Sequence, residues 1–150
     1  MSTFTIIVGL ATGMLALQAV QSTSKSGTEL SPSDLAGGYT IVAGEKFGVK
    51  EPEERIKGST VRFTEDRVVV TDKDKNEVYG ASYKLEAGAK ACRIVMTSKL
   101  ADNEGQVAHG LIEKKGDTIR LIYALPGGEE PTEFRTKDKQ LMFELKNFNK

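Results

Sequence analysis

Short segments in which apolar and polar side chains alternate follow one another along most of this chain. Alternation with a period of two residues is typical of β-strands that bury one face. The expected strands are residues 39–43, 60–64, 67–71, 78–85, 91–97, 106–114, 118–125, 132–136 and 140–146. A single helical turn is predicted at residues 31–35, where Pro32 suits a first helical position, and no helix of three turns is expected after it. The sequence therefore predicts an all-β protein.

The connections between the predicted strands are short, which constrains how the strands pair. A parallel crossover needs about a dozen residues or more, so successive strands are expected to be antiparallel neighbours. A meander of eight or nine strands must bury one face and protect its edges, and closure on itself does both. We therefore predict an antiparallel up-and-down β-barrel, with a β-sandwich as the alternative. A barrel of about eight strands is either filled by its own side chains or holds one small ligand.

The front of the chain is uncharged, and the first charged residue is Lys25. Residues 4–20 are almost entirely apolar, and small residues follow them. This pattern is typical of a secretory signal peptide, with cleavage expected after Ala19 or Ser22. The sequence thus predicts an exported protein, in the periplasm, the cell envelope or the extracellular space.

A retained membrane anchor is the alternative for residues 4–20, since their length is at the short end of what a bilayer core requires. Gly9 and Gly13 would then allow close contact with a second helix. Either interpretation divides the chain in the same way. Residues 1–22 are the signal peptide or anchor, residues 23–33 are a linker, and residues 34–150 are the barrel domain.

Charge and motif content exclude several classes of function. Of the 150 residues, 21 are Lys or Arg and 21 are Asp or Glu, so no net positive field is available to bind nucleic acid. The sequence has no P-loop, no GxSxG and no GxGxxG after a strand, so no cofactor is expected. One histidine and one cysteine leave acid–base chemistry to carboxylates and tyrosines, and we do not expect an enzyme.

The two residues best suited to metal binding, His109 and Cys92, are each the only one of their kind. Nothing in their spacing supports a zinc site, and no metal is expected. Cys92 alternates with Ile94 and Met96 and is expected to be a small core residue. His109 shares a strand face with apolar neighbours and is expected to line the barrel or its rim.

Aromatic residues are the most informative candidates for a ligand site. Tyrosines in a barrel present apolar bodies with polar tips, which suits a pocket that orients a small ligand. The candidate ligand-binding residues are Tyr39, Phe63, Tyr79, Tyr83, His109, Tyr123 and Phe134. Basic residues on the opposite strand faces are then expected to face solvent, whereas an inverted register would turn them inward and favour an anionic ligand. These basic residues are Arg62, Lys84, Arg93, Arg120 and Arg135.

Three segments, at residues 34–42, 110–121 and 126–134, together resemble a bacterial family of secreted, mostly uncharacterised lipocalin-like (calycin-like) domains. Tyr39 stands where that family has Trp, and Glu130 stands where it has Arg. The resemblance implies a barrel and an exported protein, and it brings no known activity. It also implies that Tyr39 packs under the barrel against a basic residue of the last strand, for which Lys146 is the nearest candidate.

Together these features predict an exported lipocalin-like module that holds a small, largely apolar ligand in its barrel. The alternative is a non-enzymatic structural or interaction subunit of an envelope or membrane assembly, anchored by the N-terminal helix. In that case the protein would have protein partners in the envelope and would contact the membrane through residues 4–20.

Overall fold

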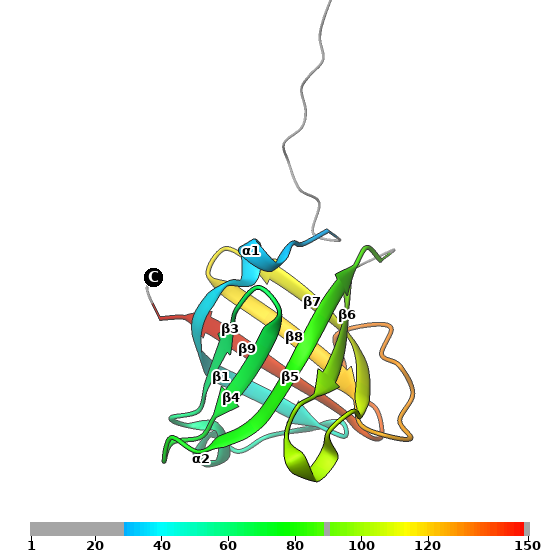
Figure 1. Cartoon of the computed structure of the whole chain (residues 1–150). Coiled ribbons are helices and arrows are strands. Elements are labelled where there is room, and N and C mark those ends of the chain that lie inside the picture. The colour runs from blue at the N-terminus through cyan, green and yellow to red at the C-terminus, as the bar shows by residue number, and fades with distance from the viewer. Residues whose placement is uncertain (1–28, 89–90, 149–150) are drawn as a thin grey trace, which may run out of the picture.

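Eight antiparallel strands close into a barrel in the computed structural model of this protein (Figure 1). The structure describes residues 29–88 and 91–148, so the signal peptide or anchor predicted at residues 1–22 lies outside the described residues. The barrel strands are β1 (Gly37–Lys46), β3 (Thr60–Phe63), β4 (Arg67–Thr71), β5 (Glu77–Glu86), β6 (Cys92–Ser98), β7 (Val107–Lys115), β8 (Thr118–Ala124) and β9 (Gln140–Asn147). From β3 onward each strand pairs with the next, and β1 closes the barrel by pairing with both β3 and β9. The predicted all-β, up-and-down barrel is confirmed.

The strand predicted at residues 132–136 is wrong. These residues belong to a loop between β8 and β9 that contains turns and no strand. Both edges of β9 are already occupied, one by β8 and the other by β1, so the sheet offers no place for another strand beside it. A short strand that was not predicted, β2 (Val49–Lys50), pairs antiparallel with the end of β1.

Three short helical segments accompany the strands: α1 (Pro32–Leu35), α2 (Glu53–Ile56) and the 3-10 turn η1 (Ala101–Asn103). The predicted helical turn is thus confirmed as α1. The Ser31 amide donates a 2.8 Å hydrogen bond to the Asp34 carboxylate, which satisfies one free donor at the start of this helix. None of the helices in the described residues has the length and hydropathy that a membrane-spanning helix requires.

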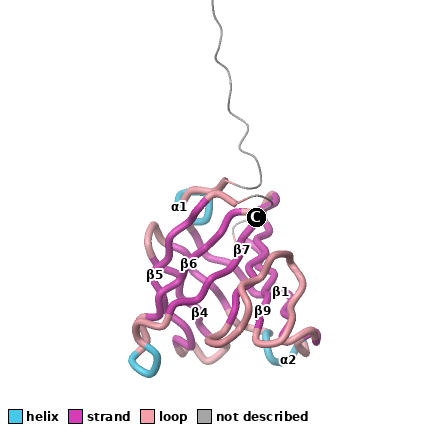
Figure 2. Tube along the Cα trace, turned by 90° about the vertical axis from the view of Figure 1, so that its right-hand side faces the viewer, coloured by secondary structure: helices cyan, strands magenta, loops and turns pink. Residues whose placement is uncertain are grey.

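The barrel has two different ends, which we call the closed end and the open end. At the closed end α1 lies across the barrel, β1 begins and β9 finishes, so both ends of the described chain lie there (Figures 1 and 2). α2 lies at the opposite, open end (Figure 2). The connections that contain η1 and that join β8 to β9 also start from strand ends at the open end.

The strands alternate as the sequence predicts, with apolar residues in the lumen and most charged residues outside. Cys92, Ile94 and Met96 are all buried inside, which confirms the expected core position of Cys92. Arg62 and Lys84 point outward and are exposed. The inverted register, which would have lined the lumen with arginines, does not occur.

A second, smaller apolar cluster lies outside the lumen. Leu111 and Ile122 are buried on the outer faces of β7 and β8, where Phe134 of the long β8–β9 loop packs against them. The loop is held by the buried Gln140, whose side-chain amide donates a 2.7 Å hydrogen bond to the Glu129 carbonyl. This loop therefore gives part of the barrel a buried outer face.

Candidate functional site

Three aromatic side chains fill the lumen at the closed end, directly under α1. Tyr39, Phe63 and Tyr83, which we call the closed-end aromatics, are each no more than 5% exposed. The Phe63 ring packs edge-to-face against both tyrosines, with ring centroids 5.9 Å from Tyr39 and 5.7 Å from Tyr83. This arrangement is favourable for aromatic pairs, and it leaves this end of the lumen packed by protein.

Both hydroxyl groups of the closed-end aromatics have backbone partners. The Tyr39 hydroxyl donates a 2.7 Å hydrogen bond to the Leu35 carbonyl at the end of α1. The Tyr83 hydroxyl donates a 2.6 Å hydrogen bond to the Thr64 carbonyl. Burial raises the pKa of both phenols, that of Tyr83 to about 12, so they stay neutral across the physiological range. These residues have the partners expected of a structural core.

The contact expected between Tyr39 and Lys146 does not form. Lys146 is paired with Thr40 across the β1–β9 ladder, so its side chain lies on the outer face, opposite to that of Tyr39, and is exposed. A different lysine contributes at this end, because the Lys114 ammonium donates a 2.6 Å hydrogen bond to the Asp34 carbonyl of α1. The helix is thus tied both to a lumen tyrosine and to β7.

The other half of the lumen, towards the open end, contains a cavity of about 230 Å³. Its lining residues are all apolar except for two tyrosines. The lining residues are Ile41, Val61, Val68, Val70, Val78, Tyr79, Met96, Leu121, Tyr123, Phe143 and Leu145. Val78 is 52% exposed, which places the entrance at the start of β5, at the open end. The barrel therefore contains an internal cavity, and two of the seven candidate residues, Tyr79 and Tyr123, line it.

Three aromatic side chains border this cavity, and we call Tyr79, Tyr123 and Phe143 the open-end aromatics. The Tyr79 and Tyr123 rings are nearly parallel, at 19°, with centroids 6.2 Å apart. Phe143 lies 6.4 Å from Tyr123 in a tilted arrangement. Gly110 lies directly opposite Tyr123 in the β7–β8 ladder, where a Cβ atom would come within 2.9 Å of the Tyr123 Cβ. Gly110 therefore makes room for the position of β8 that sets Tyr123 beside the cavity.

The hydroxyl groups of Tyr79 and Tyr123 differ from those at the closed end. Within the described part of the chain, neither hydroxyl has a protein hydrogen-bond partner. Burial raises the pKa of both, and the neighbouring Tyr79 phenol contributes to the rise at Tyr123. Tyr123 is deeply buried, yet part of its side chain stays accessible because it borders the cavity. Because they have no protein partner, these two hydroxyls have hydrogen-bonding capacity that the protein does not use. Leaving a buried hydroxyl without a partner costs free energy, which a bound oxygen would recover.

A smaller recess of about 120 Å³ adjoins the same two tyrosines, under the loop that contains η1. Tyr79 and Tyr123 belong to the lining of both hollows. The recess also has uncharged polar side chains, from Ser98, Asn103 and Gln106. The Ser98 hydroxyl is hydrogen-bonded to Asn103, so part of this polar surface is already satisfied. The tyrosine pair thus lies between the apolar cavity and a recess that also contains polar side chains.

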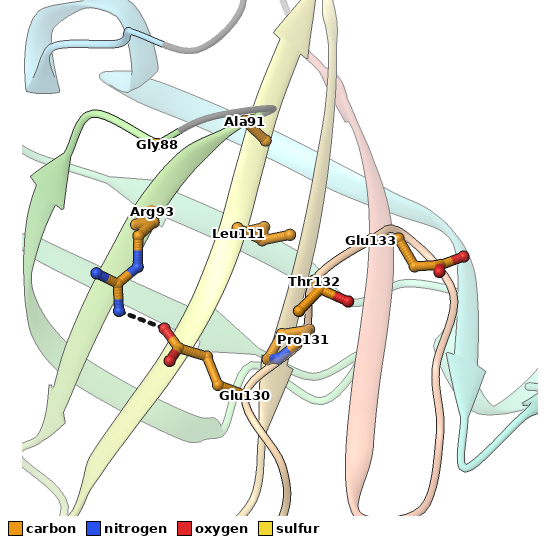
Figure 3. Close-up of a pocket in the computed structure, with 8 residues that line it drawn as sticks. All are labelled: Gly88, Ala91, Arg93, Leu111, Glu130, Pro131, Thr132 and Glu133. Carbon is orange, nitrogen blue, oxygen red and sulfur yellow. Dashed lines mark hydrogen bonds and ion pairs between the residues drawn. The ribbon is translucent and has the colours of Figure 1, made fainter.

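A larger hollow, of about 440 Å³, lies on the outer surface between β6, β7 and the β8–β9 loop (Figure 3). The small side chain of Ala91 and that of Leu111 form its apolar part, and Arg93 reaches across to an ion pair with Glu130. Arg93 also pairs with Glu86 at 3.3 Å. This groove is more open to solvent than the lumen cavity, and its one cationic residue, Arg93, is already paired with carboxylates of the protein. The lumen cavity is therefore the better candidate site.

Two of the expected site residues lie outside the lumen. His109, which was expected to line the barrel or its rim, is paired with Val95 on the outer face and is exposed, so it does not line the lumen. The sequence did not show which face of β7 points into the lumen, because its outer face also carries an apolar residue. That residue is Leu111, which the β8–β9 loop buries from outside.

Phe134 also lies outside, in the β8–β9 loop. The Arg120 guanidinium lies over its ring at 4.6 Å from the centroid and is also hydrogen-bonded to Glu113, through Nε at 2.5 Å. Of the candidate residues, only Tyr79 and Tyr123 line the cavity, while the closed-end aromatics are packed above it. Val70, Met96 and Phe143 line the cavity without having been singled out as ligand residues, although their strand alternation places them on the same face.

Among the described residues, no group of three or more histidine, cysteine or acidic side chains is arranged to hold a metal ion. Comparison of this chain with protein-family models, with curated proteins and with solved structures finds no match.

Proposed function

We propose that this protein is a binding module that holds a small, largely apolar ligand in the lumen cavity. The observation that carries the proposal is the difference between the two halves of one lumen: the closed end is packed, and the open end contains an enclosed apolar space that reaches the surface near Val78. Apolar ligand surface that enters this space leaves water, which stabilises the complex by about 25 cal/mol per Å².

The size of the cavity limits the ligand. An apolar cavity of about 150 Å³ is large enough to hold benzene. A volume of about 230 Å³ therefore suits one ring with a short substituent, or a short branched chain. Long fatty acids and polycyclic ligands would require the open end to widen.

The place of action is the second part of the proposal. The uncharged residues 4–20 and the resemblance to secreted lipocalin-like domains support export of the barrel to the periplasm, the envelope or the outside of the cell. In that setting the barrel would carry or sequester its ligand without chemical change. A cavity that binds nothing would favour the alternative, a subunit of an envelope assembly that is anchored by residues 4–20.

A titration of the full chain with ethylbenzene, followed by methyl NMR, tests the proposal. We expect shifts at lining methyl groups, represented by Ile41, Leu121 and Leu145. Leu111 and Ile122 serve as internal controls, since they are buried in the outer cluster and not in the lumen. Equal shifts in both sets, or none in either, would contradict the proposal.

Two matched variants separate the cavity from the rest of the surface. Val70→Phe places a ring in the cavity and is expected to abolish ethylbenzene binding. Val42→Phe makes the same change on the outer face, where Val42 is 46% exposed, and binding should be retained. Retained binding in a folded Val70→Phe protein would place the ligand elsewhere.

A further inference from the structure

We infer that the ligand is a neutral compound with one carbonyl or hydroxyl oxygen, which Tyr79 and Tyr123 recognise together while they exclude the corresponding carboxylate. This inference rests on the proposed binding function and names the ligand class. It follows from three features of the cavity: its unused hydroxyl groups, the closeness of the two rings, and the absence of charge from its lining.

The unused hydroxyl groups are the first feature. In the described residues, the Tyr39 and Tyr83 hydroxyls donate to carbonyls, whereas those of Tyr79 and Tyr123 have no protein partner. A tyrosine hydroxyl can donate one hydrogen bond and accept others. Since Tyr123 borders the lumen cavity and the adjoining recess, a partner for its hydroxyl has to enter one of these two hollows. A ligand oxygen fills this role, and a purely hydrocarbon ligand does not.

The relative position of the two rings is the second feature. Tyr79 comes from β5 and Tyr123 from β8, and their nearly parallel rings have centroids 6.2 Å apart. Tyr79 is also close enough to raise the pKa of Tyr123. A normal O–H···O hydrogen bond is about 2.7–2.8 Å long, so one small ligand oxygen that lies within this distance of both phenol oxygens can interact with both. A carbonyl oxygen has two lone pairs and can accept from both donors.

The lack of charge is the third feature. The cavity lining contains no lysine, arginine or histidine, and the polar side chains of the adjoining recess are uncharged. An anion that entered would lose its hydration and gain no cationic partner, which is strongly unfavourable. The same desolvation keeps both phenols neutral. The site therefore favours a neutral oxygen over a carboxylate of the same shape.

Three probes of similar size test the inference: ethylbenzene, acetophenone and benzoate. Their dissociation constants are measured at pH 7 by calorimetry on the full chain and on the double variant Tyr79→Phe/Tyr123→Phe. We expect the double variant to weaken acetophenone binding by about tenfold or more, because two hydrogen bonds are lost. Ethylbenzene should bind the double variant as tightly as the wild type, or more tightly. Benzoate should bind the wild type at least about a hundredfold more weakly than acetophenone.

Tyr83→Phe is the matched control, since it removes a hydroxyl from the same strand at the closed end, outside the cavity lining. It should leave the affinities for all three probes unchanged. The inference is overturned if the double variant changes ethylbenzene and acetophenone affinity equally, or if benzoate binds as tightly as acetophenone. Either result leaves the proposed function standing, because the cavity still binds. Failure of all three probes to bind would overturn the proposed function and this inference with it.

Discussion

The two ends of the barrel lumen contain the same aromatic residue types, two tyrosines and one phenylalanine, and use them in opposite ways. The closed-end aromatics are Tyr39, Phe63 and Tyr83, and the open-end aromatics are Tyr79, Tyr123 and Phe143. At the closed end the rings pack edge-to-face and both hydroxyls reach backbone carbonyls. At the open end the rings are stacked or tilted around a cavity, and within the described residues the hydroxyls have no protein partner.

The difference comes from what each end of the barrel places over the lumen. α1 crosses the closed end and supplies the Leu35 carbonyl, and the turn between β3 and β4 supplies that of Thr64. At the open end the long β8–β9 loop folds back over the outside of the barrel, against Leu111 and Ile122, rather than across the lumen. The same side-chain chemistry therefore stabilises the fold at one end and remains available to a ligand at the other.

The largest expected effect is unfolding at alkaline pH. Burial raises the pKa of all four tyrosines, Tyr39, Tyr79, Tyr83 and Tyr123, and that of Tyr83 reaches about 12 from its ordinary value of 10.0. A raised pKa favours the folded state fully below pH 10, and this contribution is lost as the pH rises towards 12. Tyrosinate absorbance should therefore appear together with loss of circular dichroism above pH 10. Tyr83→Phe should make the pH dependence of stability less steep, whereas tyrosinate formation near pH 10 in a folded protein would contradict the assignment.

Truncation of the phenylalanine to alanine should lower stability much more at the closed end than at the open end. Phe63→Ala removes a fully packed ring and is expected to lower the free energy of unfolding by about 3–5 kcal/mol. Phe143→Ala should cost about 1–2 kcal/mol, since this ring is only partly buried and already borders a cavity. Denaturant unfolding of both variants measures the difference. Equal costs would show that the open end is packed as tightly as the closed end.

Removal of single hydroxyl groups should give effects of opposite sign. Tyr39→Phe leaves the buried Leu35 carbonyl without its donor, and Tyr83→Phe removes a partly buried bond to the Thr64 carbonyl, so each should destabilise the protein by about 1–2 kcal/mol. Tyr123→Phe removes a hydroxyl that has no protein partner and should be neutral or stabilising by up to about 1 kcal/mol. Thermal unfolding of the three variants measures these changes in stability. A clear loss of stability in Tyr123→Phe would mean that its hydroxyl is satisfied in the free protein.

The smallest effect is expected at the loop beside the open end. The Thr136 amide and hydroxyl donate to the Glu45 carboxylate at 2.8 Å and 2.5 Å, which holds the pKa of Glu45 below its ordinary value. Thr136→Val removes one of these bonds, so the pKa of Glu45 should rise and stability should fall by about 1 kcal/mol or less. In the wild type this contribution is present above the ordinary carboxyl pKa and is lost as the pH falls through the folded-state value. A carboxyl NMR titration measures the pKa of Glu45. An unchanged pKa in Thr136→Val would show that the Thr136 hydroxyl does not hold the Glu45 carboxylate.

The sequence predicts the barrel well because its inward faces alternate clearly. Tyr79, Ala81, Tyr83 and Leu85 were expected on one face of β5, and they all point inward. The helical turn at α1 could also be predicted, since Pro32 and the serine before it are typical of a helix start.

The errors arise where both faces of a strand are apolar. On β7, alternation alone does not decide between the face with His109 and Leu111 and the face with Ala108 and Ile112. The decision depends on the path of the β8–β9 loop, which buries Leu111 from outside. Phe134 was misplaced for a different reason, because the strand predicted at residues 132–136 is part of that loop. The cavity itself could not be predicted, since its volume depends on ring orientations that no local pattern specifies.

The position of the two chain ends gives the barrel a direction. Because β1 begins and β9 finishes at the closed end, the described chain both enters and leaves on the side opposite the entrance near Val78. A tether, a fused domain or a solid support joined at either terminus would therefore hold the barrel from behind. The mouth would stay turned towards the surroundings, and ligand exchange would need no detachment.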